Sequence, residues 1–111
     1  MSLENSNVVD AVGIDEISGT AMLTIADSWD WNNETEHLLA LQDKLNAYFA
    51  FVETGEIYDS YPKANGRKLL IEIIGRYPLP SKAQQFLQKA RETAADLKIE
   101  IATQYYPGST A

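Results

Sequence analysis

The chain has 111 residues, 45% of them hydrophobic, and a formal net charge of −7, which predicts one packed domain at residues 8–106 between a disordered tail at 1–7 and a short tail at 107–111. An acidic chain lacks the basic face that phosphate binding needs, so a nucleic-acid partner is not expected. The absence of cysteine excludes disulfides and thiolate chemistry, and with neither a signal peptide nor a membrane span we expect a soluble, cytoplasmic protein with no membrane partner.

Two short apolar segments come first and predict a β-hairpin. Residues 8–14 and 20–26 are rich in β-branched and apolar side chains, and a polar turn at 15–19 separates them. In the second segment Met22, Thr24 and Ala26 point to one side. Leu23, Ile25 and Asp27 point to the other, so neither face is cleanly polar. The turn carries a glycine near its end, as tight turns often do.

A long helix is predicted next, because the apolar period changes from two to about 3.6 between residues 34 and 52. Its buried stripe is expected to consist of Leu38, Leu41, Leu45, Tyr48, Phe49 and Val52. The residues expected to face water are Glu36, Gln42, Asp43, Lys44 and Asn46. Asn33 suits the N-cap with Glu36 as capping-box partner, and Gly55 suits a left-handed helix end after Thr54.

The second half of the chain predicts a second hairpin, a helix and a last strand. Residues 56–61 and 68–77 look extended, and the turn between them contains Asn65-Gly66. A helix capped by Ser81, with Gln84 in the capping box, follows a proline-rich break. Its buried residues are expected to be Phe86, Leu87, Ala90, Ala94 and Leu97. Residues 98–105 alternate as a final strand.

The order ββαββαβ predicts an α+β two-layer sandwich, in which a mainly antiparallel five-stranded sheet carries two helices on one face. Without the first strand the order matches ferredoxin-like folds, so a ferredoxin-like variant is possible. In that fold the first strand of the motif lies centrally, with a strand on each side. An additional N-terminal hairpin strand would then have to be displaced, or the strand order would have to change. The strand order is therefore left open.

The stretch DSWDWNNETEH at residues 27–37 admits two interpretations. Glu34 and His37 stand at i, i+3 with Asp27 and Asp30 upstream, a spacing that metal sites use. Only one such element and one histidine exist, so we favour an ordinary helix entry and expect no metal, cofactor or catalytic residue. We expect His37 to be a solvated or capping residue, because nothing marks a nucleophile for it to activate.

Trp29 and Trp31 in the same stretch are either half-buried covers of the sheet edge or exposed binding anchors. We favour the first interpretation and keep both residues, with Asp30 and His37, as candidate binding residues.

A second candidate patch lies at residues 55–68. Tyr58, Tyr61 and Arg67 crowd the predicted hairpin, a mixture suited to a peptide edge or a small polar ligand. We favour the simpler interpretation, in which the tyrosines pack over the sheet and Arg67 pairs with a nearby acid.

These residues together resemble a known family. The stretches VVDAVGID, LTIADSWDW, YPKANGR and IEIIGRYPLP, and above all HLLALQDKLNAYFAFVETGEIY, are similar to a family of small bacterial proteins known only as a domain of unknown function. The resemblance covers roughly residues 8–104. It implies a single-domain α+β protein and supplies no reaction, cofactor or site residue.

Three functional hypotheses follow. Acidity, small size and the lack of a catalytic constellation favour a non-enzymatic protein-interaction domain, of an immunity-like or regulatory kind, with another protein as its partner. The alternative is a small-ligand-binding protein or enzyme with a pocket between the loop at residues 27–33 and the hairpin at 56–61. A homodimer through an edge strand at residues 98–105 is compatible with either.

Overall fold

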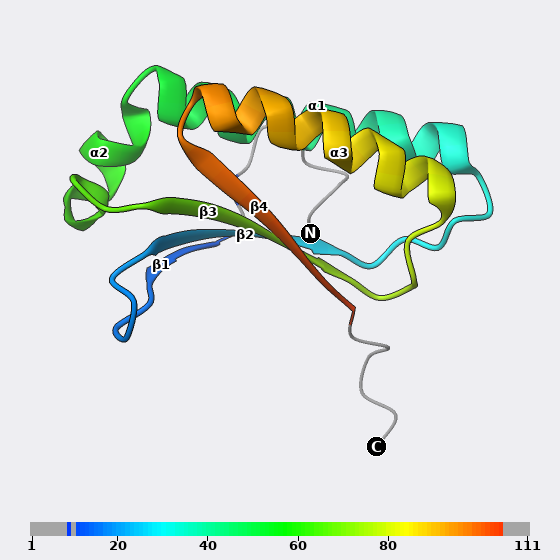
Figure 1. Cartoon of the computed structure of the whole chain (residues 1–111), viewed down its shortest axis with the longest axis horizontal. Coiled ribbons are helices and arrows are strands. Elements are labelled where there is room, and N and C mark those ends of the chain that lie inside the picture. Colours follow the sequence, from blue (N-terminus) through cyan, green and yellow to red (C-terminus); the bar gives the residue numbers. More distant parts are fainter. Residues whose placement is uncertain (1–8, 10, 106–111) are drawn as a thin grey trace.

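The computed structural model describes residue 9 and residues 11–105, which form two layers, a sheet and a set of helices on one of its faces (Figure 1). The elements in chain order are β1 (Ala11–Ile14), β2 (Ala21–Asp27), α1 (Glu34–Glu53), α2 (Glu56–Ser60), the 3-10 turn η1 (Pro62–Ala64), β3 (Leu69–Gly75), α3 (Ser81–Asp96) and β4 (Ile99–Tyr105). The predicted tails at 1–7 and 107–111 lie outside the described residues.

The four strands stand in the sheet in the order in which they follow along the chain. β1 pairs with β2 in an antiparallel hairpin, whereas β2–β3 and β3–β4 are parallel. Parallel neighbours need a crossover, and α1 with α2 makes the first while α3 makes the second. Both crossovers pass over the same face, as predicted, but the described residues form three helices and not the predicted two (Figure 1).

The prediction of five mainly antiparallel strands is wrong, because residues 56–61 do not form a strand. Gly55 is left-handed at φ 82° as predicted, but it redirects the chain into helix α2. Ile57 in that helix is completely buried in the core, which fixes the segment against the protein. Without a hairpin between residues 56 and 77, β3 returns parallel to β2, and a ferredoxin-like order is excluded.

The core lies between the sheet and the helices. Alternate residues of the strands point toward the helices, among them Leu23 and Ile25 of β2 and Ile71 and Ile73 of β3. The predicted stripe of α1 packs against them, and every member except the first, Leu38, is buried. In addition, the Tyr48 hydroxyl donates a hydrogen bond of 2.6 Å to the carbonyl of Thr24, which ties α1 to β2.

Lys44 corrects one prediction about α1. It was expected to face water, yet it is fully buried, and its Nζ lies 5.8 Å from the ring centroid of Tyr48. The long aliphatic stem of lysine lets the residue join the packed face of the helix. The result is that α1 exposes no basic side chain.

The helix ends match the predictions in part. Asn33 is the N-cap of α1, and its side chain accepts a hydrogen bond of 3.1 Å from the backbone N–H of Glu36. The prediction for α3 is wrong in detail, because Pro80 is the cap and Ser81 is already the first helical residue. Gln84 donates its amide to the carbonyl of Leu79 instead of completing a capping box.

Candidate functional site

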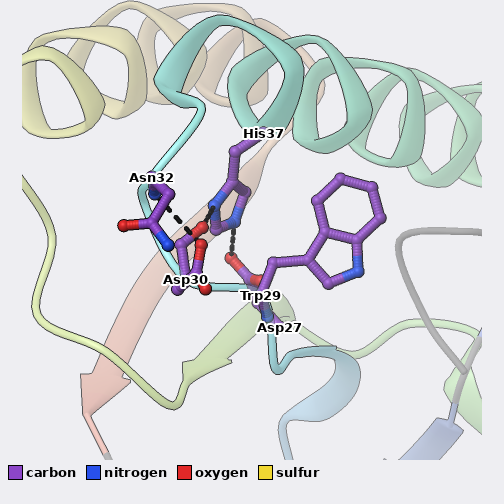
Figure 2. A network of polar contacts seen from close by, with 5 residues as sticks. All are labelled: Asp27, Trp29, Asp30, Asn32 and His37. Carbon is purple, nitrogen blue, oxygen red and sulfur yellow. Dashed lines mark hydrogen bonds and ion pairs between the residues drawn. The ribbon is translucent and has the colours of Figure 1, made fainter.

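A buried histidine–aspartate pair joins the end of β2 to the start of α1 (Figure 2). The Nε2 of His37 lies 2.6 Å from Oδ2 of Asp27, and the two side chains are only 1% and 3% exposed. The expectation of a solvated or capping histidine is therefore wrong, because His37 is buried and paired with Asp27. The physical reason is the strand period, which places Asp27 on the helix-facing side of β2 below the first turn of α1.

The second ring nitrogen fixes the hydrogen positions of the pair. His37 Nδ1 lies 2.8 Å from the backbone carbonyl of Asp30, and a carbonyl oxygen only accepts, so Nδ1 carries a hydrogen and donates it. The 2.6 Å contact between Nε2 and the carboxylate then needs one proton between the two atoms. Asp27 and His37 thus hold that proton jointly, and the pair is neutral overall wherever the proton sits.

Burial raises the pKa of the Asp27 carboxyl above its ordinary value, because desolvation penalises the charged form. The hydrogen bond from His37, the charge on that ring and the backbone N–H of Trp29 act in the opposite direction on this pKa, with smaller effects. The Trp29 N–H donates to Asp27 Oδ1 at 3.1 Å. Each carboxylate oxygen of Asp27 thus accepts one hydrogen bond from within the chain.

Both tryptophans pack on the imidazole and are half-buried, so the favoured interpretation of them agrees with the structure. Trp31 stacks on the His37 ring with 3.5 Å between centroids and 11° between planes. Trp29 lies at 5.6 Å in a tilted arrangement and also packs against the core. The two indoles shield the pair from water while leaving part of their own surface accessible.

The loop at residues 28–33 owes its shape to short aspartate turns. Asp27 accepts from the N–H two residues on, and Asp30 does the same with the N–H of Asn32 at 3.0 Å (Figure 2). The carboxylate of Asp30 is therefore engaged with its own loop, and only its carbonyl reaches His37. Of the carboxylates near His37, the structure selects Asp27 as the partner of the ring.

The second predicted patch lies far from this pair. The loop at residues 28–33 and helix α2 lie at opposite ends of α1, whose 20 residues span about 30 Å (Figure 1). The pocket expected between residues 27–33 and 56–61 is therefore not formed. Tyr58 packs partly against the core, and Tyr61 is 44% exposed.

Arg67 has a structural role that differs from the predicted ion pair. Its Nε donates to the carbonyl of Lys63 at 2.7 Å, and its Nη1 donates to the carbonyl of Gly19 at 3.0 Å. Arg67 therefore links the turn before β3 to the turn between β1 and β2.

The surface of α1 shows a charge pattern that the predictions did not isolate. Residues 27–59 hold eight of the sixteen acidic residues but only one of the nine basic ones, Lys44, so the whole net charge of −7 resides in this segment. The outward face of α1 and α2 carries five exposed acids, here called the acidic stripe: Glu36, Asp43, Glu53, Glu56 and Asp59. Lys44 is buried, so no lysine or arginine from this segment is exposed on the stripe.

A hollow of about 300 Å³ lies at the ends of the parallel strands. We call it the strand-end hollow. Asp27 lines it together with the ends of β3 and β4 and the start of α3. Sequence reasoning missed it, since it depends on three strand ends that are distant in the chain.

No group of three or more histidine, aspartate or glutamate side chains in the described part of the chain converges as a metal site would require. Both nitrogens of His37 are also engaged within the chain. Among the described helices, none is long and apolar enough to cross a bilayer.

Fold and site together define a small two-layer α+β domain with an acidic helical face and a buried histidine–aspartate pair. The chain belongs to a family of unknown function, DUF6572, whose model matches residues 1–107. This match confirms the resemblance to a family of unknown function. No curated protein and no solved structure matches the chain, so function must be argued from the surface itself.

Proposed function

We propose that the chain is a non-enzymatic protein-interaction domain, of an immunity-like or regulatory kind, whose α1–α2 surface binds a basic protein. The observation that carries this proposal is the acidic stripe. Exposed charges of one sign raise the rate of encounter with an oppositely charged partner and select against acidic competitors.

Other exposed side chains suit the same surface. Leu39 is 56% exposed between the acids Glu36 and Asp43, and it offers an apolar contact within the stripe. Tyr61 follows α2, and tyrosine is frequent among residues that dominate binding energy. At the other end of α1, Asp30 is exposed and Trp31 is half-buried. Asp30 and Trp31 thus flank the stripe at one end, and Tyr61 flanks it at the other.

The test compares two variants that remove the same charge. The stripe variant carries Asp43→Asn, Glu53→Gln and Glu56→Gln. The control carries Glu92→Gln, Asp96→Asn and Glu100→Gln, which are also exposed but lie on α3 and β4. Each is immobilised beside the wild type in cell extract, and calorimetry then measures the affinity of any captured protein at two salt concentrations.

We expect the captured protein to be basic, to bind the control variant as tightly as the wild type, and to lose at least tenfold in affinity for the stripe variant. The wild-type affinity should also fall with salt. Equal losses for both variants, or capture of nothing in repeated trials, would rule out the acidic stripe as the binding surface.

A homodimer is a second candidate, because β4 lies at the edge of the sheet as the dimer hypothesis requires. An edge strand presents unpaired backbone groups that a second copy can meet across a two-fold axis. Light scattering over a hundredfold concentration range decides this point, and a constant monomer mass excludes the dimer.

A further inference from the structure

The strand-end hollow has a specific structural origin. Asp27, Gly75 and Tyr105 are neighbours in one row across β2, β3 and β4. The central residue of the row has no side chain, and all three residues line the hollow. Doubly wound parallel sheets bind ligands beyond the carboxyl ends of their strands, and the hollow lies at the same ends of the parallel strands here. The strand-end hollow has a volume of about 300 Å³, which is at the lower end of the range for small-molecule sites.

The lining determines which chemistry the hollow accepts. Asp27, which forms a neutral pair with His37, is the one carboxylate among the residues that line it, and none of them is a lysine, arginine or histidine that could attract an anion. A carboxylate has about four acceptor positions, and the chain uses one on each oxygen of Asp27. Acceptor capacity therefore remains for a donor that enters the hollow.

Aromatic and neutral polar groups complete the lining. Tyr77 and Tyr105 are 43% and 53% exposed, and tyrosine rings attract organic cations over their faces. Thr103 and Gln84 add hydroxyl and amide groups, while Ile73 supplies an apolar floor. These groups suit a molecule with a positively charged end and a small apolar body.

We propose that the strand-end hollow binds a small organic amine in its ammonium form, with Asp27 accepting from the ammonium group and Tyr77 and Tyr105 flanking the apolar body. This site is separate from the acidic stripe, and it does not depend on the protein-interaction function.

Three probes that share one ring test the proposal: benzylamine, benzyl alcohol and benzoate. Each is titrated into ¹⁵N-labelled protein at neutral pH, and amide shifts are followed by NMR. We expect saturable shifts for benzylamine at Asp27, Gly75 and Tyr77, at least tenfold weaker binding of the alcohol, and no saturable shifts for benzoate. Shifts for benzylamine that map to the acidic stripe, or equal affinity for the alcohol, would overturn the proposal.

Variants then separate the contribution of the Asp27 carboxylate from that of the shape of the hollow. Asp27→Asn should weaken benzylamine at least tenfold and leave the alcohol nearly unchanged. Gly75→Leu should abolish binding by filling the hollow, with Gly75→Ala as an intermediate, since a Cβ there meets Tyr77 O at 3.5 Å and Gln104 O at 3.8 Å, which are ordinary contacts. Glu100→Gln, an exposed acid outside the hollow, is the control and should bind like the wild type. Unchanged affinity in Asp27→Asn would also overturn the proposal.

Discussion

At the scale of single residues, the Asp27–His37 pair is a hydrogen-bonded contact between two buried side chains. It joins β2 to α1 across ten residues of chain and holds the loop that carries both tryptophans. Buried ion pairs stabilise a protein little in comparison with well-packed apolar residues, but the loss of one partner is costly. Mutation can separate the small net stabilisation by the pair from the large cost of losing one partner.

His37→Phe keeps a flat ring against Trp31 but removes both nitrogens, which leaves Asp27 buried without its partner. We expect this variant to lose about 3–5 kcal/mol of unfolding free energy, measured by urea denaturation. The double variant Asp27→Leu/His37→Phe should recover most of that loss, because an apolar pair replaces a buried polar one. A double variant no more stable than His37→Phe alone would contradict this account.

Stability should depend on pH through Asp27 in a direction unusual for an aspartate. Burial raises its pKa, so the folded chain keeps the carboxyl proton at pH values where the unfolded chain, with the ordinary value of 3.8, has released it. The folded state then binds more protons, and stability falls as pH rises through this window. The stability of the wild type minus that of Asp27→Asn should therefore decrease as the pH rises above the ordinary value of 3.8 and through the raised pKa of Asp27.

Asp15 serves as a control for that measurement, because its pKa is shifted in the opposite direction. The N–H of Ile17 and the hydroxyl of Ser18 donate to its carboxylate, and these hydrogen bonds lower its pKa. The stability that Asp15 contributes is present above its ordinary pKa and is lost as the pH falls. Asp15→Asn should thus change the pH profile with the reverse sign. Parallel profiles for the two variants would show that neither shift arises from the contacts described.

At the scale of elements, the junction between α1 and α2 depends on the backbone of Gly55. Its φ of 82° is left-handed, and a Cβ at this position would meet no atom within 4 Å. Gly55→Ala should therefore cost about 1–2 kcal/mol through backbone strain alone. Gly13→Ala is a matched control, because it is equally open but not left-handed, and it should cost nothing. Thermal unfolding of both variants gives the comparison, and equal stability would contradict the strain argument.

The elements with a strong period were predictable, and the errors have local causes. The helix at residues 34–53 was predictable because its apolar stripe, its asparagine cap and its glycine end all agree. Residues 56–61 are too short for any period to separate a strand from one and a half helical turns. Once that segment was assigned as a strand, the direction of β3 was necessarily wrong.

The candidate site was predictable only in part. The alternation of Leu23, Ile25 and Asp27 already indicated that the aspartate shares a face with core residues. The same pattern did not show that His37 sits above it, because that contact depends on the path of six loop residues. The gap at Gly75 depends on the register of three strands, which no local pattern specifies.

At the scale of the whole molecule, the concentration of charge in residues 27–59 sets the response to salt. Acids that repel one another across α1 and α2 destabilise the folded state, and about 0.15 M salt shortens the screening length to about 8 Å. We expect added sodium chloride to raise the thermal midpoint by about 4 °C, equivalent to about 1 kcal/mol. The Asp43→Asn, Glu53→Gln, Glu56→Gln variant should lose most of this effect, and the Glu92→Gln, Asp96→Asn, Glu100→Gln variant should retain it. Equal salt responses would place the repulsion elsewhere.

The agreement between strand order and chain order also affects how the protein folds. Within the described residues, β2, β3 and β4 each pair with the strand that precedes them along the chain, so each strand meets a partner that has already been made. During synthesis, β1, β2 and α1 can assemble before β3 leaves the ribosome, and β4 only adds to an edge that already exists. The growing chain can therefore bury each new strand as it emerges, which limits the time during which an apolar strand is open to aggregation.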